Sequence, residues 1–93
     1  MTHERLLYLA HLVDRVNTEV DANASINYGY ALGCYIHVTM FYTKPYVSRA
    51  FWESVGTNDP ELTNGDKDLV KGEAFLRVLL RSAKNYPPMR AKS

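Results

Sequence analysis

Residues 22–43, ANASINYGYALGCYIHVTMFYT, decide the fold, because these twenty-two residues contain no Asp, Glu, Lys or Arg. Every even position from 26 to 42 is apolar or aromatic. A period of two is typical of a β-strand with one buried face. The same residues also recur at helical steps, so the pattern alone allows a strand or a helix. The length of the segment helps to distinguish these structures.

A single strand is too long for this chain. Seventeen extended residues would span roughly 55 Å at ~3.3 Å per residue, whereas a compact chain of this size has a radius of gyration near ~12 Å. A hairpin turning at Gly33 and Cys34 would be short enough, but its two-residue turn pairs Leu32 with Tyr35. The even-numbered apolar set would then face the odd-numbered set of the other arm. We keep as the alternative an α+β domain with a hairpin in residues 26–42 packed on helices.

A helix of about 20 residues would be roughly 30 Å long, which suits the domain. One seam would contain Tyr28, Ala31, Tyr35, Val38 and Tyr42, and a second Ile26, Gly29, Gly33, Ile36 and Met40. A helix that is apolar nearly all round is buried by neighbours on several sides. We therefore predict an all-α domain of four helices with this uncharged helix at its centre, although each glycine costs about 1 kcal/mol relative to alanine.

A membrane-spanning helix is the third interpretation, since Gly29-x-x-x-Gly33 resembles a close-packing motif of such helices. Four polar residues within or beside the segment argue against it: Asn23, Asn27, His37 and Thr39.

The flanking sequence predicts three further helices. Thr2 can cap a helix whose apolar residues recur from Leu6 to Val20. Lys44-Pro45 interrupts the chain, and the spacing from Tyr46 to Val55 predicts a short helix ended by Gly56. A polar loop over 57–65 precedes a last helix that starts near residue 66 and stops at Pro87-Pro88. Residues 1–93 should form one domain, with 87–93 as a flexible tail.

Composition narrows the class of protein. The 93 residues carry eleven Lys and Arg against ten Asp and Glu, a net charge of +1, which disfavours a polybasic nucleic-acid binder. Cys34 is the single cysteine, so an intramolecular disulfide framework is excluded. The N-terminus lacks the pattern of a secretory signal, and we expect a cytoplasmic protein.

No motif predicts catalysis, a metal or a cofactor. Cys34 and His37 would share a helix face, but a metal needs three or four ligands. We expect instead a buried cysteine beside a core histidine. His3, His11 and Asp14 are expected on the surface. The acidic residues Asp59, Glu61, Asp66 and Asp68 do not follow the calcium-loop pattern, because Asn64 and Val70 stand where glycine and glutamate are required.

The candidate binding features are the surplus aromatic residues and a basic stripe on the last predicted helix, formed by Arg77, Arg81 and Lys84. A domain of this size can hardly bury all seven tyrosines, and Tyr and Trp are enriched at interfaces. The candidate partner-binding residues are Tyr28, Tyr35, Tyr42, Tyr46, Trp52, Arg77, Arg81 and Lys84.

These features lead to one function hypothesis and two alternatives. The first is a non-enzymatic protein-binding module, an adaptor or inhibitor that occludes a partner, with a homodimer interface through the tyrosine seam or the region from Tyr46 to Trp52. Small inhibitors of host or defence machinery carried by phages or mobile elements have this general size. The first alternative is a helical nucleic-acid-binding protein that uses the basic stripe. The second is a small-molecule or catalytic site lined by Tyr28, Tyr30, Cys34 and His37.

Overall fold

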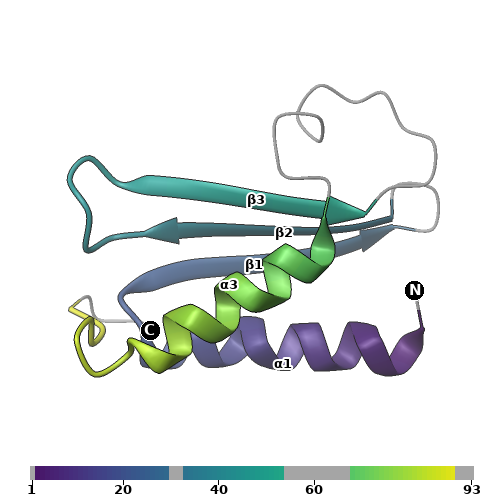
Figure 1. Ribbon diagram of the computed structural model, residues 1–93, viewed down its shortest axis with the longest axis horizontal. Coiled ribbons are helices and arrows are strands. Elements are labelled where there is room, and N and C mark those ends of the chain that lie inside the picture. The colour runs from purple at the N-terminus through teal and green to yellow at the C-terminus, as the bar shows by residue number, and fades with distance from the viewer. Residues whose placement is uncertain (1, 30–32, 54–67, 90–93) are drawn as a thin grey trace.

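The uncharged stretch forms a hairpin and not a helix. The computed structural model describes residues 2–29, 33–53 and 68–89, and in it β1 (Ala22–Gly29) pairs antiparallel with β2 (Gly33–Met40). The described residues make two helices and a three-stranded antiparallel sheet in the order β1-β2-β3 (Figure 1). The four-helix prediction is therefore wrong, and the chain has the α+β class of its alternative.

The register explains how the hairpin keeps the apolar alternation. Gly29 pairs with Gly33, which leaves three residues between the strands and sets even positions opposite even positions, as in the pair Ile26 and Ile36. A two-residue turn at Gly33 and Cys34 would instead set even positions opposite odd positions and mix the two faces. The alternation with a period of two is therefore that of a hairpin whose strands end at Gly29 and begin again at Gly33.

A second helix, predicted over 46–55, is also wrong, because the described residues 47–53 form a strand. β3 (Val47–Glu53) pairs antiparallel with β2, and Phe51 lies opposite Ile36. Phe51 and Trp52 are consecutive and point to opposite faces, yet only 1% and 7% of their surfaces are exposed. Because both faces of β3 bury apolar side chains, its apolar residues do not alternate with a period of two, and their spacing resembles that of a helix. Gly56, the expected helix end, lies outside the described residues.

The first and last predicted helices are present, but the last ends at Arg81 and not at Pro87-Pro88, because residues 82–86 form turns. α1 (His3–Glu19) begins after Thr2, whose side-chain oxygen accepts a hydrogen bond from the Arg5 N–H at 3.1 Å. α3 (Leu69–Arg81) begins after Asp68, whose carboxylate accepts from the N–H groups of Val70 and Lys71. These side chains satisfy backbone donors that have no partner inside a helix.

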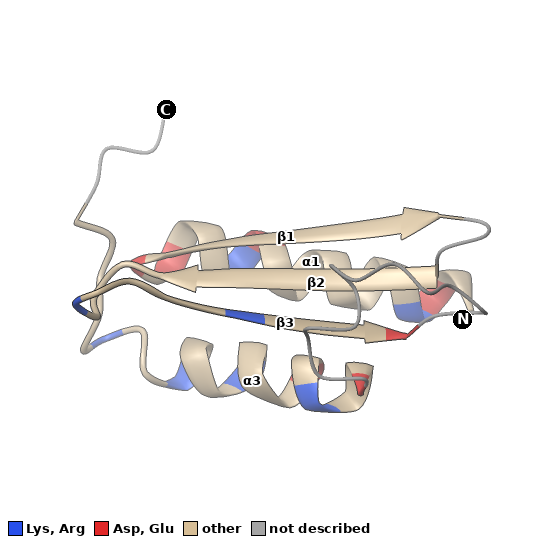
Figure 2. Cartoon of the chain, turned by 90° about the horizontal axis from the view of Figure 1, so that it is seen from above, with Lys and Arg blue, Asp and Glu red and all other residues tan. Residues whose placement is uncertain are grey.

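Both helices pack on the same face of the sheet (Figure 1). The core lies between these layers and contains the even-numbered residues of β2 together with the inner stripes of the helices. Its most deeply buried side chains are Phe51, Leu9, Ile36, Leu76, Val16, Val20 and Val38. The two helices contact each other and run in the same direction (Figure 2). Arg5 of α1 forms an ion pair with Glu73 of α3.

The other face of the sheet carries no helix among the described elements. Its side chains are mostly polar, and on it Tyr35 stacks on His37 with ring centroids 6.4 Å apart. The Thr39 and Ser48 hydroxyls share a hydrogen bond of 2.8 Å. In the described part of the chain, no helix is long and apolar enough to cross a membrane.

Near its C-terminus, the described chain returns to the start of β1. The Asp21 N–H donates to the Tyr86 carbonyl at 2.8 Å, and the Asp21 carboxylate accepts from the Met89 N–H at 3.4 Å. Residues 90–93 of the expected tail lie outside the described residues.

Candidate functional site

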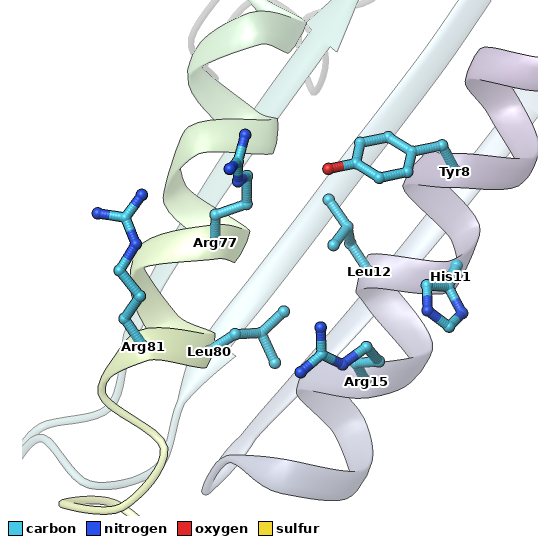
Figure 3. Close-up of a pocket in the computed structure, with 7 residues that line it drawn as sticks. All are labelled: Tyr8, His11, Leu12, Arg15, Arg77, Leu80 and Arg81. Atoms are coloured by element: carbon cyan, nitrogen blue, oxygen red, sulfur yellow. The ribbon is translucent and has the colours of Figure 1, made fainter.

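The candidate site is a groove between α1 and α3 with a volume of about 500 Å³ (Figure 3). Four of its lining residues come from α1 and three from α3. They are Tyr8, His11, Leu12, Arg15, Arg77, Leu80 and Arg81. We call it the α1–α3 groove.

The helical repeat places these residues along facing sides of the two helices. Tyr8, Leu12 and Arg15 follow one another at about one turn on α1, as Arg77 and Arg81 do on α3. Leu12 is 4% exposed and Leu80 packs against the core, so both leucines are held in place from below. The groove therefore has apolar side chains at its base and cationic side chains at its rim.

The side chains of the rim differ in how they are held. The Tyr8 hydroxyl points across the groove toward Arg77, and Arg15 points toward Leu80 (Figure 3). Arg15 donates two hydrogen bonds to Glu19, Nε to Oε2 at 2.8 Å and Nη2 to Oε1 at 3.1 Å. This hydrogen-bonded contact raises the pKa of Arg15 and lowers that of Glu19. Arg15 is thus oriented by a neutralising partner.

Arg77 and Arg81 are the available cations of the groove. Both are exposed, and within the described residues neither has a carboxylate in ion-pair contact. Arg81 lies in the last turn of α3, where a cation also stabilises the helix through its dipole. Planar guanidinium groups with free N–H donors bind carboxylates and phosphates. The groove is therefore suited to an anionic group attached to an apolar one.

The structure separates the predicted aromatic residues. Tyr28 and Tyr35 lie on opposite faces of the sheet, so the tyrosine seam of the predicted helix does not exist. Tyr42 stacks on Tyr86 with ring centroids 3.9 Å apart, and burial raises the pKa of Tyr42. Tyr46 is 51% exposed and meets Phe41 edge-on.

The remaining predicted residues are also spread over the molecule. Trp52 is buried opposite Tyr35. Arg77 and Arg81 alone of the candidate set line the groove, whereas Lys84 is exposed in the turn after α3.

Cys34 and His37 do not form a joint site. On a strand, positions three apart face opposite sides, so Cys34 lies in the core and His37 stacks on Tyr35 on the other face. The described residues contain no group of three or more His, Cys, Asp or Glu that could hold a metal. His3 and Asp14 are exposed and His11 lines the groove, while Asp59, Glu61 and Asp66 lie outside the described residues.

We expect the Cys34 thiol to be unreactive in the folded protein. Its side chain is 2% exposed, and burial, with a further contribution from Glu53, raises its pKa. Because the folded state favours the neutral thiol, its contribution to stability is present below the ordinary thiol pKa and is lost as pH rises through the higher folded value. Titration with a chromogenic disulfide reagent at pH 8 should show slow labelling that becomes fast in denaturant. Fast labelling of the native protein would contradict this.

Sequence reasoning missed five of the seven groove residues, namely Tyr8, His11, Leu12, Arg15 and Leu80. The available signal was the polar side of each amphipathic helix beside its apolar stripe. That signal does not say which helices are neighbours, and the groove exists only because α1 and α3 are adjacent. No protein-family model, curated protein or solved structure matches the chain.

Proposed function

We propose that this protein is a non-enzymatic binding module whose α1–α3 groove holds an acidic, partly apolar segment of another protein. The observation that supports the proposal is that Arg77 and Arg81, which have no ion-pair partner among the described residues, lie beside an apolar base formed by Leu12 and Leu80. A Leu or Phe of the partner would pack on the leucines, while flanking carboxylates would accept hydrogen bonds from the guanidinium groups. Binding of this kind acts by covering the segment that it holds.

An acidic protein segment fits this groove better than a nucleic acid does. A nucleic-acid surface presents phosphates over a long stretch and favours a continuous basic face. Here the net charge is +1, and Arg15 is already neutralised by Glu19. The Arg5–Glu73 pair places a further carboxylate between the same two helices. Within the groove, the two arginines without an ion pair among the described residues, Arg77 and Arg81, therefore lie close together beside an apolar base.

Binding of a synthetic peptide tests the proposal. The probe is a fluorescently labelled peptide in which Glu residues flank a central Leu, and its affinity is measured by anisotropy. An exposed ion pair contributes up to about 1 kcal/mol, so reversing both charges in Arg77→Glu with Arg81→Glu should weaken binding by about tenfold or more. A peptide with Ser in place of Leu should also bind more weakly, since it cannot use Leu12 and Leu80.

Lys44→Glu is the matched control, because Lys44 is exposed but does not line the groove. It should leave the affinity unchanged apart from a small long-range effect. An equal loss of peptide affinity in the control and in the groove variant would contradict a specific site. Absence of peptide binding by the unmodified protein would contradict the proposal. If a single-stranded oligonucleotide instead binds, more tightly than the peptide and with steep salt dependence, the nucleic-acid alternative replaces it.

A cytoplasmic location belongs to the same proposal. The one cysteine is a buried free thiol, which is compatible with a reducing compartment.

A further inference from the structure

The outer edge of β1 offers a second surface, separate from the groove. β1 is paired only on its β2 side among the described residues, so one side of its backbone faces outward. Edge strands usually carry charged residues, prolines or bulges that prevent pairing with another chain. β1 has none of these in its sequence ANASINYG, and it carries no charge (Figure 2).

The first half of this edge is already occupied. Asn17 of α1 reaches Ala24 with both ends of its amide: Nδ2 donates to the Ala24 carbonyl at 2.8 Å, and Oδ1 accepts from the Ala24 N–H at 2.7 Å. The Ala22 N–H donates to the Val20 carbonyl at 2.8 Å. Just before the strand, Asp21 is bonded to the backbone of Tyr86 and Met89. A further strand cannot pair here without displacing these contacts.

The second half of the edge has no hydrogen-bond partner among the described residues. In an antiparallel strand, the backbone groups of alternate residues point to the same side. Because the Ala24 groups point outward to Asn17, those of Ile26 and Tyr28 point outward as well. No described residue is hydrogen-bonded to these outward groups. Two N–H donors and two carbonyl acceptors therefore stand next to one another on an edge that is otherwise satisfied.

We propose that this edge pairs with the same edge of a second copy of the chain, on a two-fold axis through Asn27. An antiparallel alignment with Asn27 opposite Asn27 sets Ile26 of each copy opposite Tyr28 of the other. Each such pair exchanges two hydrogen bonds, so all four free groups of each copy are satisfied. A register centred on Ile26 would set Tyr28 opposite Ala24, whose groups Asn17 already holds. Among the registers that use only described residues, the occupied half of the edge thus selects this alignment.

α1 provides apolar surface beneath the same edge. Ala10 and Leu6 lie seven and eleven residues before Asn17, which on a helix of 3.6 residues per turn is the same side within about 20°. That side faces the β1 edge, because Asn17 contacts Ala24 from it. Leu6 and Ala10 are only partly buried, and Tyr28 is 52% exposed. A second copy would cover these side chains, with the small Ala10 near the axis allowing the helices to approach.

The occupant is a second copy because the free groups are self-complementary. The two free donors and two free acceptors of one chain match their own set under a two-fold rotation, and the uncharged strand creates no repulsion between copies. The opposite edge of the sheet is different: β3 carries Arg49 and Glu53, and α3 runs alongside it (Figure 2). The α1–α3 groove lies on the other flank of α1, so a dimer leaves two grooves open.

Disulfide trapping tests the alignment. In the proposed dimer, Asn27 faces its own copy in a non-hydrogen-bonded pair, with Cα atoms about 4.5 Å apart, a distance that a disulfide can bridge. Mild oxidation of Asn27→Cys should give a covalent dimer in high yield, with the linkage at position 27 established by mass spectrometry. Ser25→Cys is the matched control on the same exposed face; its copies would be separated by about 14 Å and should not cross-link. Cys34 is buried and does not compete.

Charge on the edge gives the second test. Tyr28→Lys should raise the dissociation constant of the dimer by about tenfold or more, because Lys is the usual blocking residue of edge strands. Val47→Lys, at a 43% exposed position of β3, should leave it unchanged. Sedimentation measures the constant, and circular dichroism checks that both variants fold. A monomer at all accessible concentrations, or equal cross-linking at positions 25 and 27, overturns the proposal.

Discussion

Replacing Ile36 by alanine is expected to lower the free energy of unfolding by about 3–4 kcal/mol. Ile36 is fully buried at the centre of β2, between Ile26 on one neighbouring strand and Phe51 on the other. Removing its outer atoms leaves a cavity that strands paired on both sides cannot close. Domains have free energies of unfolding of about 5–15 kcal/mol, so the substitution would remove a large part of the stability of the folded state. Urea denaturation followed by circular dichroism measures the change.

His37→Ala is the matched control, because His37 is the next residue along the strand and faces the opposite side of the sheet. It loses a ring contact with Tyr35 and should cost about 1 kcal/mol or less. Alternation of large and small losses along β2 is specific to a strand with one buried face. Similar losses of stability in Ile36→Ala and His37→Ala would contradict a β2 strand with one buried face.

Gly72→Val should be the other severely destabilising change, with an expected loss of about 3 kcal/mol. Gly72 is buried in α3 where this helix crosses β3, and a Cβ atom added there would lie 2.8 Å from Phe51 Cβ and 3.0 Å from Phe51 Cγ. The Phe51 Cβ is attached directly to the β3 backbone, so the helix would have to move away from the sheet. Thermal unfolding of the variant measures the loss.

Gly72→Ala and Ala74→Val separate the steric clash with Phe51 from the change in helix propensity. Alanine gains about 1 kcal/mol of helix propensity at position 72 but still adds the clashing atom, so its net loss should be smaller than that of valine. Ala74 is exposed on the same helix, and valine there should cost only the difference in propensity, about 0.5 kcal/mol. A Gly72→Val protein as stable as Ala74→Val would contradict the close approach of α3 and β3.

Both proposed surfaces depend on α1. Tyr8, Leu12 and Arg15 on one flank contribute to the groove, and Leu6 and Ala10 lie on the flank near the β1 edge. The helical repeat separates these flanks, so a variant on one should leave the other unaffected. Arg77→Glu with Arg81→Glu should therefore keep the dimer, and Tyr28→Lys should keep peptide binding by each chain.

The local pattern of the sequence was sufficient to identify α1 and α3 as helices. Thr2 was recognised as the start of α1 because a capping side chain bonds the backbone N–H groups a few residues ahead of it, whereas the cap of α3, Asp68, and the end of that helix at Arg81 were not predicted. The apolar repeat of each helix also identifies its buried side, including Leu9 and Leu76. These features depend on neighbours within a few residues, so they can be read without knowledge of the fold.

Tertiary structure decided the sheet and both surfaces. The spacing of the segment 22–43 is compatible with a helix and with a hairpin, and the observed register, with Gly29 opposite Gly33, keeps the even positions on one face. β3 imitated a helix because Phe51 and Trp52 are buried on opposite sides. Arg77 and Tyr8 line the same groove, and Asn17 is hydrogen-bonded to Ala24, although no local pattern in the sequence encodes either pairing. The sequence by itself determined that α1 and α3 are helices with one buried side, because that pattern depends on neighbours within a few residues. The partners of each strand and helix were decided by tertiary packing, because pairing joins residues that are far apart in the sequence.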